Sequence, residues 1–147
     1  MAHLSPEGKV YQAGTLSGNP AAMATGLATL RTLRTRPGLY RALDTRAQAL
    51  ARGLGQAASA AGVEVQINRA GSMLTVFFTR EPVRDWATAS CSDTARYARF
   101  FHGMLRQGVY LPPSQYEAFF VSAAHGAREI AFALRAAYRV MRELGRT

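Results

Sequence analysis

The sequence is almost devoid of lysine and cysteine, and both shortages limit the chemistry that it can support. Lys9 is the only lysine in 147 residues, although lysine and arginine together number 18. Cys91 is the only cysteine, so an intrachain disulfide and metal sites that need two cysteines are excluded. Any chemistry that requires a lysine amine therefore has a single candidate residue.

Long apolar runs are also missing, and this bears on where the protein resides. No stretch reaches the roughly 20 apolar residues of a membrane-spanning helix. Residues 1–6 lack the basic start and the apolar centre of a secretory signal. The sequence therefore predicts a soluble, cytoplasmic protein with no membrane partner.

Acidic residues are few, 9 against 18 basic ones, which gives a net charge of +9. Strongly basic domains often bind nucleic acid or anionic surfaces. Here the arginines are scattered from Arg31 to Arg146, and the phenylalanines lie in apolar contexts instead of alternating with basic residues. A nucleic-acid partner is therefore not favoured, and a non-catalytic basic binding module stays open as an alternative function.

Several common catalytic patterns are absent as well. His3, His102 and His125 lie far apart in the sequence and lack the spacing of a two-histidine metal site. There is no Gly-x-Ser-x-Gly element, and Cys91 has no evident base near it. The sequence thus predicts no metal site and does not support nucleophilic hydrolysis. We expect His102 and His125 to make local hydrogen bonds instead.

The most informative stretch that is present is a glycine-rich loop within residues 10–20, which ends at a helix start. Gly14 and Gly18 permit a positive φ and the close approach of another group, and hydroxyl groups lie between them. Asn19 suits a helix N-cap and Pro20 suits the first helical position. Such a loop can bind an anion such as phosphate. A purely structural turn that caps the helix is the alternative.

Hydrophobic periodicity and turn residues predict an α+β fold. We expect helices where apolar residues recur every three to four positions and strands where they alternate. The expected helices are 20–33, 39–61, 93–107 and 127–144, and the expected strands are 63–67, 73–79, 109–111 and 118–121. A polar connection at 80–91 and a proline-rich loop at 112–115 join them. This order favours helices covering a small antiparallel sheet, with Gly62 as a helix C-cap and Gly126 as a poor N-cap.

Several segments resemble those of a known enzyme family. Residues 11–20 read Tyr-Gln-Ala-Gly-Thr-Leu-Ser-Gly-Asn-Pro, and residues 108–118 read Gly-Val-Tyr-Leu-Pro-Pro-Ser-Gln-Tyr-Glu-Ala. Residues 100–105, residues 122–125 and the apolar run after Gly71 add further matches. Together they resemble the glutamate-1-semialdehyde 2,1-aminomutases of the class III pyridoxal-phosphate aminotransferase family. The resemblance covers nearly the whole chain, but only the last third of such an enzyme.

This resemblance implies a domain division and a role for the intact enzyme. Residues 1–19 would be a loop segment left from a large cofactor-binding domain, and residues 20–147 would be the small C-terminal domain of a fold type I pyridoxal-phosphate enzyme. The intact enzyme would be a homodimeric isomerase. It would convert the small amino-aldehyde glutamate-1-semialdehyde into 5-aminolevulinate for porphyrin synthesis. A fragment of another class III aminotransferase is the alternative, against which residues 111–115 argue.

The resemblance also assigns roles to residues. Pyridoxal or pyridoxamine 5'-phosphate would be held mostly by the upstream domain, while Gly14 and Thr15 would reach the phosphate of the cofactor in the other subunit. Glu117 would lie near the substrate, with Gln115 as loop scaffolding. The surroundings of Lys9 do not match the motif of the Schiff-base lysine of the family. No catalytic residue is therefore assigned, and the chain alone is expected to be inactive.

Overall fold

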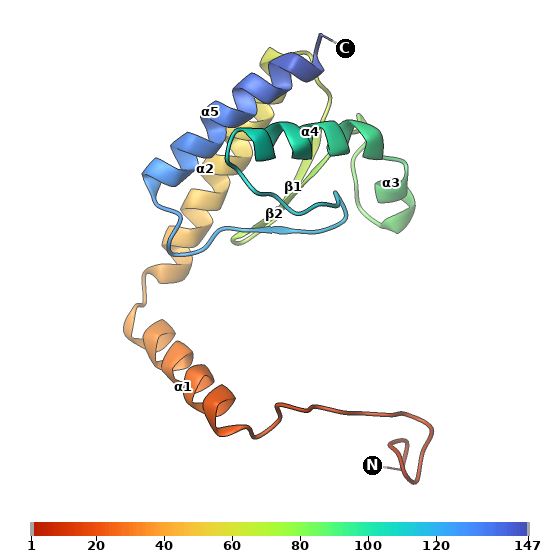
Figure 1. The fold of residues 1–147 in the computed structure, drawn as a ribbon, viewed down its shortest axis with the longest axis vertical. Helices are drawn as coiled ribbons and strands as arrows, with labels where there is room; N and C mark the ends of the chain where they lie inside the picture. Colours follow the sequence, from red (N-terminus) through yellow and green to blue (C-terminus); the bar gives the residue numbers. More distant parts are fainter. Residues whose placement is uncertain (1, 147) are drawn as a thin grey trace. The chain divides into compact units, whose positions relative to one another are not determined.

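The computed structural model describes residues 2–146, and the chain divides into two compact units, Met1–Pro37 and Gly38–Thr147. The first unit carries the glycine-rich loop and helix α1 (Pro20–Thr35), and the second carries the remaining helices and the sheet (Figure 1). Within residues 2–146, no helix combines the length and the apolar character needed to cross a membrane.

Helix α1 begins at a side-chain cap. The Asn19 Oδ1 atom accepts hydrogen bonds from the N–H groups of Ala21 at 3.0 Å and Ala22 at 3.2 Å. Pro20 occupies the first helical position, where its missing N–H costs nothing. The cap that the sequence predicts at Asn19 is therefore confirmed.

No residue of α1 is buried, so this helix depends on its own hydrogen bonds. Its threonine hydroxyls donate to carbonyl groups one turn earlier, at 2.8 to 3.0 Å: Thr25, Thr29, Thr32 and Thr35. The apolar side chains at helical spacing are exposed: Met23, Leu27 and Leu30. The helix runs to Thr35, beyond the expected end at residue 33, and stops where Arg36 precedes Pro37, a position that disfavours helical conformation.

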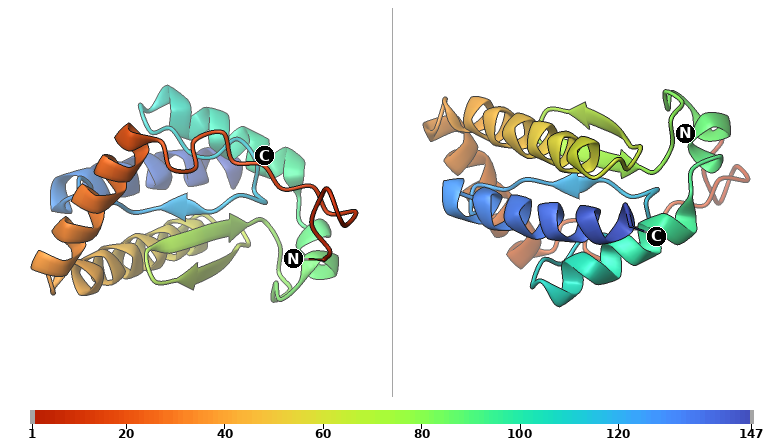
Figure 2. Two further views of the ribbon diagram at one scale, coloured as in Figure 1. Left: turned by 90° about the horizontal axis from the view of Figure 1, so that it is seen from below. Right: turned by 90° about the horizontal axis from the view of Figure 1, so that it is seen from above.

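The second unit is a three-stranded antiparallel sheet with its three long helices packed on one side of it (Figure 2). Its strands pair in the order β1 (Gln66–Ala70), β2 (Met73–Phe77) and β3 (Phe119–Phe120). Its helices are α2 (Leu39–Ala60), α3 (Trp86–Ser90), α4 (Thr94–Arg106) and α5 (Ala127–Leu144). The expected α+β class, a small antiparallel sheet covered by helices, is confirmed.

The register of the sheet separates a buried face from an open one. Leu74 pairs with Phe119, and the two are 1% and 6% exposed. The next pair along, Met73 and Phe120, is 41% and 66% exposed. Because paired residues point to the same side of a sheet and successive residues to opposite sides, the first pair faces the helices and the second lies on the uncovered face.

Helix α5 approaches its neighbours closely, because glycines face it. A Cβ atom added to Gly53 of α2 would collide with the Leu134 side chain, and one added to Gly103 of α4 would lie 2.6 Å from Val140 Cγ1. The buried residues of α5 are Ile130, Ala136, Ala137, Val140, Met141 and Leu144. The apolar stripe expected on the last helix therefore forms the centre of the core.

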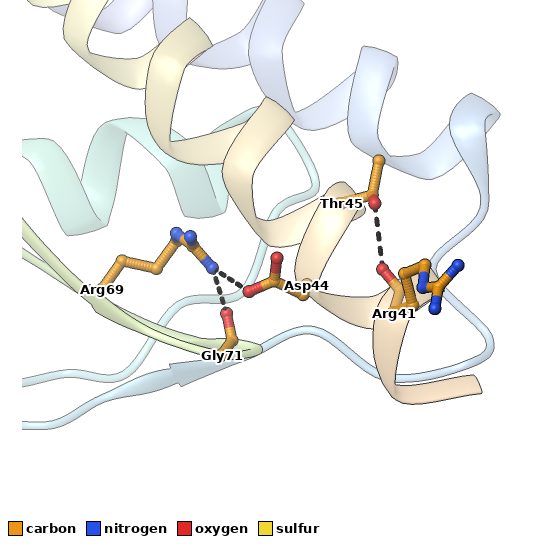
Figure 3. Close-up of polar contacts among 5 residues, drawn as sticks. All are labelled: Arg41, Asp44, Thr45, Arg69 and Gly71. Atoms are coloured by element: carbon orange, nitrogen blue, oxygen red, sulfur yellow. Dashed lines mark hydrogen bonds and ion pairs between the residues drawn. The ribbon is translucent and has the colours of Figure 1, made fainter. Parts of the chain in front are cut away.

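A polar contact ties the β1–β2 turn to helix α2 (Figure 3). Arg69 Nη1 donates to Asp44 Oδ1 at 2.5 Å and to the Gly71 carbonyl at 2.6 Å. Gly71 has φ +57°, which glycine adopts at little cost in a tight turn. The residue after Asp44, Thr45, donates its hydroxyl to the Arg41 carbonyl one turn earlier in α2. Both partners of the Arg69–Asp44 pair are partly exposed, so we assign it to orientation of the hairpin more than to stability.

The first strand starts later than the sequence predicts, at Gln66 instead of residue 63. Gly62 has φ +66°, and the Val63 N–H donates back to the Ala58 carbonyl at 2.9 Å. This is the bonding that ends a helix at a left-handed glycine. The predicted C-cap at Gly62 is thus confirmed, but the cap occupies Val63 and delays the strand.

The strand expected at residues 109–111 is wrong. Val109 N–H donates to the Met104 carbonyl at 2.9 Å, so it belongs to the termination of α4. Gly108 there has φ +81°. The residues that follow belong to no strand, and an apolar triplet without a pairing partner does not become one.

Two helix starts are stabilised by a side chain three residues after the N-cap, and the first of these helices is one that the sequence does not predict. The connection at 80–91 contains α3, where the Thr88 N–H donates to Asp85 Oδ1 at 2.9 Å and the Asp85 N–H donates to Thr88 Oγ1 at 3.1 Å. These bonds to Thr88 also hold the pKa of the Asp85 carboxyl below its usual value. At α5, the Glu129 carboxylate accepts from the Gly126 N–H at 2.9 Å. A side chain three residues into the helix thus compensates for a glycine that lacks a capping group.

The close approach of α4 and α5 predicts opposite effects of two glycine substitutions. Gly103→Ala should lower the free energy of unfolding by about 1 kcal/mol, since overpacking against the stiff, buried Val140 outweighs the gain in helix propensity. Gly55→Ala, in α2, should raise it by about 0.5–1 kcal/mol, because its Cβ would meet only Ile67 Cδ1 at an ordinary 3.8 Å. Urea denaturation of both variants measures the difference. Stabilisation by both substitutions would contradict the packing described.

The cap of α1 predicts a local effect. Asn19→Ala should destabilise the start of the helix by about 1 kcal/mol, because it leaves the N–H groups of Ala21 and Ala22 without their acceptor. Amide hydrogen exchange at those residues should then become about fivefold faster. Asn19→Ser is the control and should restore most of the protection. Equal exchange rates in the parent and Asn19→Ala would show that the cap does not stabilise α1.

Candidate functional site

The loop before α1 folds into consecutive turns. The Ser17 N–H donates to the Gly14 carbonyl at 2.9 Å, and the Asn19 N–H donates to the Leu16 carbonyl at 3.1 Å. Gly18 lies within the second of these turns with φ +76°, a conformation that residues other than glycine adopt at a cost. The local sequence thus determines a tight, glycine-dependent loop that leads directly into the Asn19 cap.

The Ser17 side chain lies close to the backbone of Gly14. A Cβ atom at position 14 would collide with Ser17 Oγ and lie 3.3 Å from Ser17 Cβ. The serine hydroxyl therefore occupies the space that a side chain at residue 14 would need. A larger residue at position 14 would require the Ser17 hydroxyl to rotate away.

The free hydrogen-bond donors of this loop belong to Thr15 and Leu16. Within the part of the chain that the structure describes, the Thr15 hydroxyl and the N–H groups of Thr15 and Leu16 have no acceptor. Thr15 is exposed. Three donors close together on an exposed loop fit a phosphate dianion, which prefers several charge-assisted hydrogen bonds.

The N-terminus of α1 does not add donors to this group. Pro20 has no N–H, and the N–H groups of Ala21 and Ala22 bond to the Asn19 side chain. The Met23 N–H donates to the Asn19 carbonyl. The donors left for an anion are therefore those of the loop itself, because the cap uses the N–H groups of the helix terminus.

Lys9 lies in the same unit, in the segment joined by the Leu4–Val10 bridge. It is exposed, and it makes no hydrogen bond or ion pair with any residue in the range 2–146. Among the described residues, none buries the Lys9 amine or forms an ion pair with it. The surroundings thus lack the features that activate a lysine as a nucleophile.

Glu117 lies in the second unit, at the end of an irregular loop of residues 112–117 that we call the Glu117 loop. Its main chain is fixed: its N–H donates to the Ser114 carbonyl at 3.2 Å, and its carbonyl accepts from Thr75 Oγ1 at 3.2 Å. Its side chain is exposed, and its carboxylate has no partner among residues 2–146. The structure therefore holds the backbone of Glu117 and leaves its carboxylate available.

Glu117 borders a hollow of about 1040 Å³. Aromatic side chains that are partly or largely exposed form part of its wall: Tyr110, Phe120 and Phe132. Arg128 and Arg135 of α5 also line it, together with Glu129. A hollow that joins apolar walls to charges of both signs is suited to a small molecule carrying both an amino and a carboxyl group.

The arginines of this hollow are residues that the sequence does not single out. Arg128 and Arg135 come from α5, whereas Glu117 precedes β3, and only the fold brings these segments together. The one usable signal is the position of Arg128 in the first turn of a helix, where a basic residue is unfavourable unless it has another role.

The histidines behave differently from one another. His125 Nδ1 accepts from the Ser122 N–H at 2.9 Å, so the local hydrogen bond expected there is confirmed. The His102 ring makes no hydrogen bond within the described residues and lies edge-on to Phe101, with ring centroids 5.2 Å apart. The expectation of a hydrogen bond is therefore wrong for His102.

Gly14 and Thr15 belong to the first unit and Glu117 to the second. Within its own unit, each is exposed on a loop that internal hydrogen bonds hold in shape. Their assignment to cofactor and substrate stays a prediction.

The chain is similar to known enzymes over nearly its full length. No family model matches it. It is 59% identical over 140 residues to the glutamate-1-semialdehyde 2,1-aminomutase of Deinococcus radiodurans, an alignment that covers 93% of this chain and 32% of that enzyme. It is 54% identical over 147 residues to the enzyme of the same name from Myxococcus xanthus, covering 100% of this chain and 34% of the relative. The chain thus spans about a third of the length of the curated relatives that it matches.

Solved structures of aminotransferases share the fold. An omega-transaminase from Sphaerobacter thermophilus superimposes with a TM-score of 0.75 at 22% identity, covering 94% of this chain and 31% of that one. A transaminase solved with pyridoxal phosphate bound superimposes with a TM-score of 0.72 at 22% identity, covering 97% of this chain and 33% of that one. At this level of identity the likeness concerns the fold, which is that of the C-terminal domain of fold type I pyridoxal-phosphate enzymes. By its sequence, the chain belongs to the glutamate-1-semialdehyde 2,1-aminomutase family of class III pyridoxal-phosphate enzymes and corresponds to their C-terminal portion.

Proposed function

We propose that this chain supplies the C-terminal portion of a glutamate-1-semialdehyde 2,1-aminomutase. The reaction is the conversion of glutamate-1-semialdehyde into 5-aminolevulinate for tetrapyrrole synthesis. The observation that carries the proposal is the 51–60% identity to aminomutases over nearly the whole chain. The enzyme would act as a cytoplasmic homodimer, with residues 1–19 part of its large domain and residues 20–147 its small one.

The cofactor in this proposal is pyridoxal or pyridoxamine 5'-phosphate, held mostly by the portion of the enzyme that this chain does not contain. When bound, such a cofactor supplies an electron sink for reactions at the carbon that carries an amino group. The chain has no activated lysine to hold it, since Lys9 is exposed and without partners among residues 2–146. The 147-residue chain alone should therefore not catalyse the reaction.

The role of Gly14 and Thr15 would be to bind the phosphate of the cofactor in the other subunit. The Thr15 hydroxyl and the N–H groups of Thr15 and Leu16 would donate to its oxygens. The small size of Gly14 leaves room for the Ser17 hydroxyl beside it, which supports a preference for glycine there. The free donors of an exposed loop support the phosphate as its ligand.

The role of Glu117 would be to bind the substrate. A carboxylate on a loop whose backbone is already fixed loses little entropy when it accepts hydrogen bonds from an amino group. The apolar walls of the hollow would reduce the access of water to that interaction, which strengthens it. The arginines of α5 offer the opposite charge for the carboxylate of the same small molecule.

A chimaera tests the proposed function directly. In it, this chain replaces the matching third of the Deinococcus radiodurans aminomutase, to which it is 59% identical. The chimaera should form 5-aminolevulinate from glutamate-1-semialdehyde, while the 147-residue chain alone should not. A folded, cofactor-loaded chimaera that makes no 5-aminolevulinate would refute the aminomutase proposal. If it instead transfers its amino group to an external keto acid, the chain comes from another class III aminotransferase.

The phosphate role predicts the effect of changing Thr15 in this chimaera. Thr15→Ala should weaken binding of pyridoxal phosphate by roughly tenfold or more, because it removes a hydrogen bond to a charged group. Thr15→Ser should bind nearly as the parent does. Thr29→Ala is a matched control, since the Thr29 hydroxyl donates within its own helix. Equilibrium dialysis gives the dissociation constants. Equal constants for Thr15→Ala and Thr29→Ala would contradict a phosphate contact at Thr15.

A further inference from the structure

We infer that Tyr97 is a positioning residue for Glu117, and that its buried hydroxyl holds the Glu117 loop in the shape that presents the carboxylate to the substrate. The inference rests on the proposed substrate role of Glu117. Tyr97 lies on α4, and its Oη donates to the Pro112 carbonyl, the first residue of the loop, at 2.7 Å.

The Glu117 loop needs such support because its own main chain donates little. Pro112 and Pro113 have no N–H groups, so this part of the loop can be held only through carbonyl groups and side chains. The described contacts follow this pattern. Tyr97 bonds the carbonyl at one end of the loop, and Thr75 of β2 bonds the carbonyl of Glu117 at the other end.

The middle of the loop is attached more weakly. Gln115 is only 1% exposed, and its Nε2 donates to the Ser92 carbonyl at 3.4 Å, near the limit for a hydrogen bond. Gln115 Oε1 and Ser92 Oγ are buried and have no partner among residues 2–146. Because this attachment is long and incomplete, the end contacts are the ones that determine where Glu117 lies.

Tyr97 is the more rigid of the two end contacts. The residue is 2% exposed. Its ring packs edge-on against Phe78, with centroids 6.2 Å apart, and lies 6.3 Å from Phe100. Its N–H also donates to the Asp93 carbonyl in the first turn of α4. A ring held on these sides cannot swing its hydroxyl away from Pro112 without disturbing the core.

The hydroxyl of Tyr97 is also kept in the form that can donate. Burial raises the pKa of Tyr97 above its usual value, and the negative charge of Glu117 raises it further. Tyr97 therefore remains protonated at neutral pH and donates to the Pro112 carbonyl.

A double-mutant cycle in the chimaera separates positioning from a general structural role. Tyr97→Phe keeps the packed ring and removes only the hydroxyl, so kcat/KM should fall by roughly tenfold through displacement of Glu117. In a chimaera that already carries Glu117→Gln, Tyr97→Phe should change kcat/KM by less than about twofold. Tyr138→Phe on α5 is the matched control and should leave kcat/KM unchanged. An equal fall in both backgrounds would overturn the inference.

Failure of the inference is distinguishable from failure of the proposed function. An inactive parent chimaera refutes the proposed function. If Glu117→Gln lowers kcat/KM but Tyr97→Phe does not, Glu117 keeps its role and the positioning role of Tyr97 is wrong. If Glu117→Gln itself has no effect, the substrate role of Glu117 is wrong and the inference falls with it.

Hydrogen exchange in the 147-residue chain gives a readout that does not require activity. Tyr97→Phe should speed exchange of the Glu117 N–H, which donates to the Ser114 carbonyl within the loop. Exchange in the centre of α5 should stay unchanged, which shows that the core is intact. Unchanged exchange at Glu117 would overturn the claim that Tyr97 holds the loop.

Discussion

The close approach of α5 to α2 and α4 is the contact on which the second unit depends. It exists because Gly53 and Gly103 present no side chain where Leu134 and Val140 enter. With the helices this close, their apolar sides form a continuous layer under the buried face of the sheet. β3 then pairs with β2 within the sheet, and Phe119 of β3 and Val121 after it pack against that layer.

The same packing explains why a polar loop without regular structure can have a defined shape. Tyr97 belongs to α4, and its neighbours Phe78 and Phe100 belong to the apolar core. The core thus determines the position of the hydroxyl, and the hydroxyl determines where a proline-rich segment lies. The packed core therefore restrains the loop that carries the Glu117 carboxylate, through the hydrogen bond from Tyr97 to the Pro112 carbonyl.

Much of this fold follows from the sequence, because strong local signals agree with the tertiary structure. The bounds of α5, the cap at Asn19 and the C-cap at Gly62 are set by residues within a few positions of the feature itself. The strand predicted at residues 109–111 is absent, because strand formation depends on a pairing partner that the sequence alone does not identify. Helix α3 is missed because a five-residue helix has too few turns for periodicity, although its cap involves only Asp85 and Thr88.

The residues of the candidate site also divide into those that the sequence identifies and those that only the fold reveals. Thr15 and Glu117 are found from the resemblance to a family, since nothing in the spacing of single residues distinguishes them from ordinary loop positions. Arg128 and Arg135 are not found, because they reach the hollow only after α5 folds against segments that precede it. The importance of the free donors at Thr15 becomes evident only from the structure. There, the Asn19 side chain already accepts the hydrogen bonds of the N–H groups at the helix terminus.

The threonines of α1 have a consequence for how that helix meets other surfaces. Each of these hydroxyls is already satisfied by a carbonyl of its own helix. The threonine side chains of α1 therefore need no hydrogen-bond partner from another surface. A surface that covers α1 has to match its shape and its apolar area more than a pattern of hydrogen bonds. A surface that covers α1 would therefore leave none of these hydroxyls without a hydrogen-bond partner.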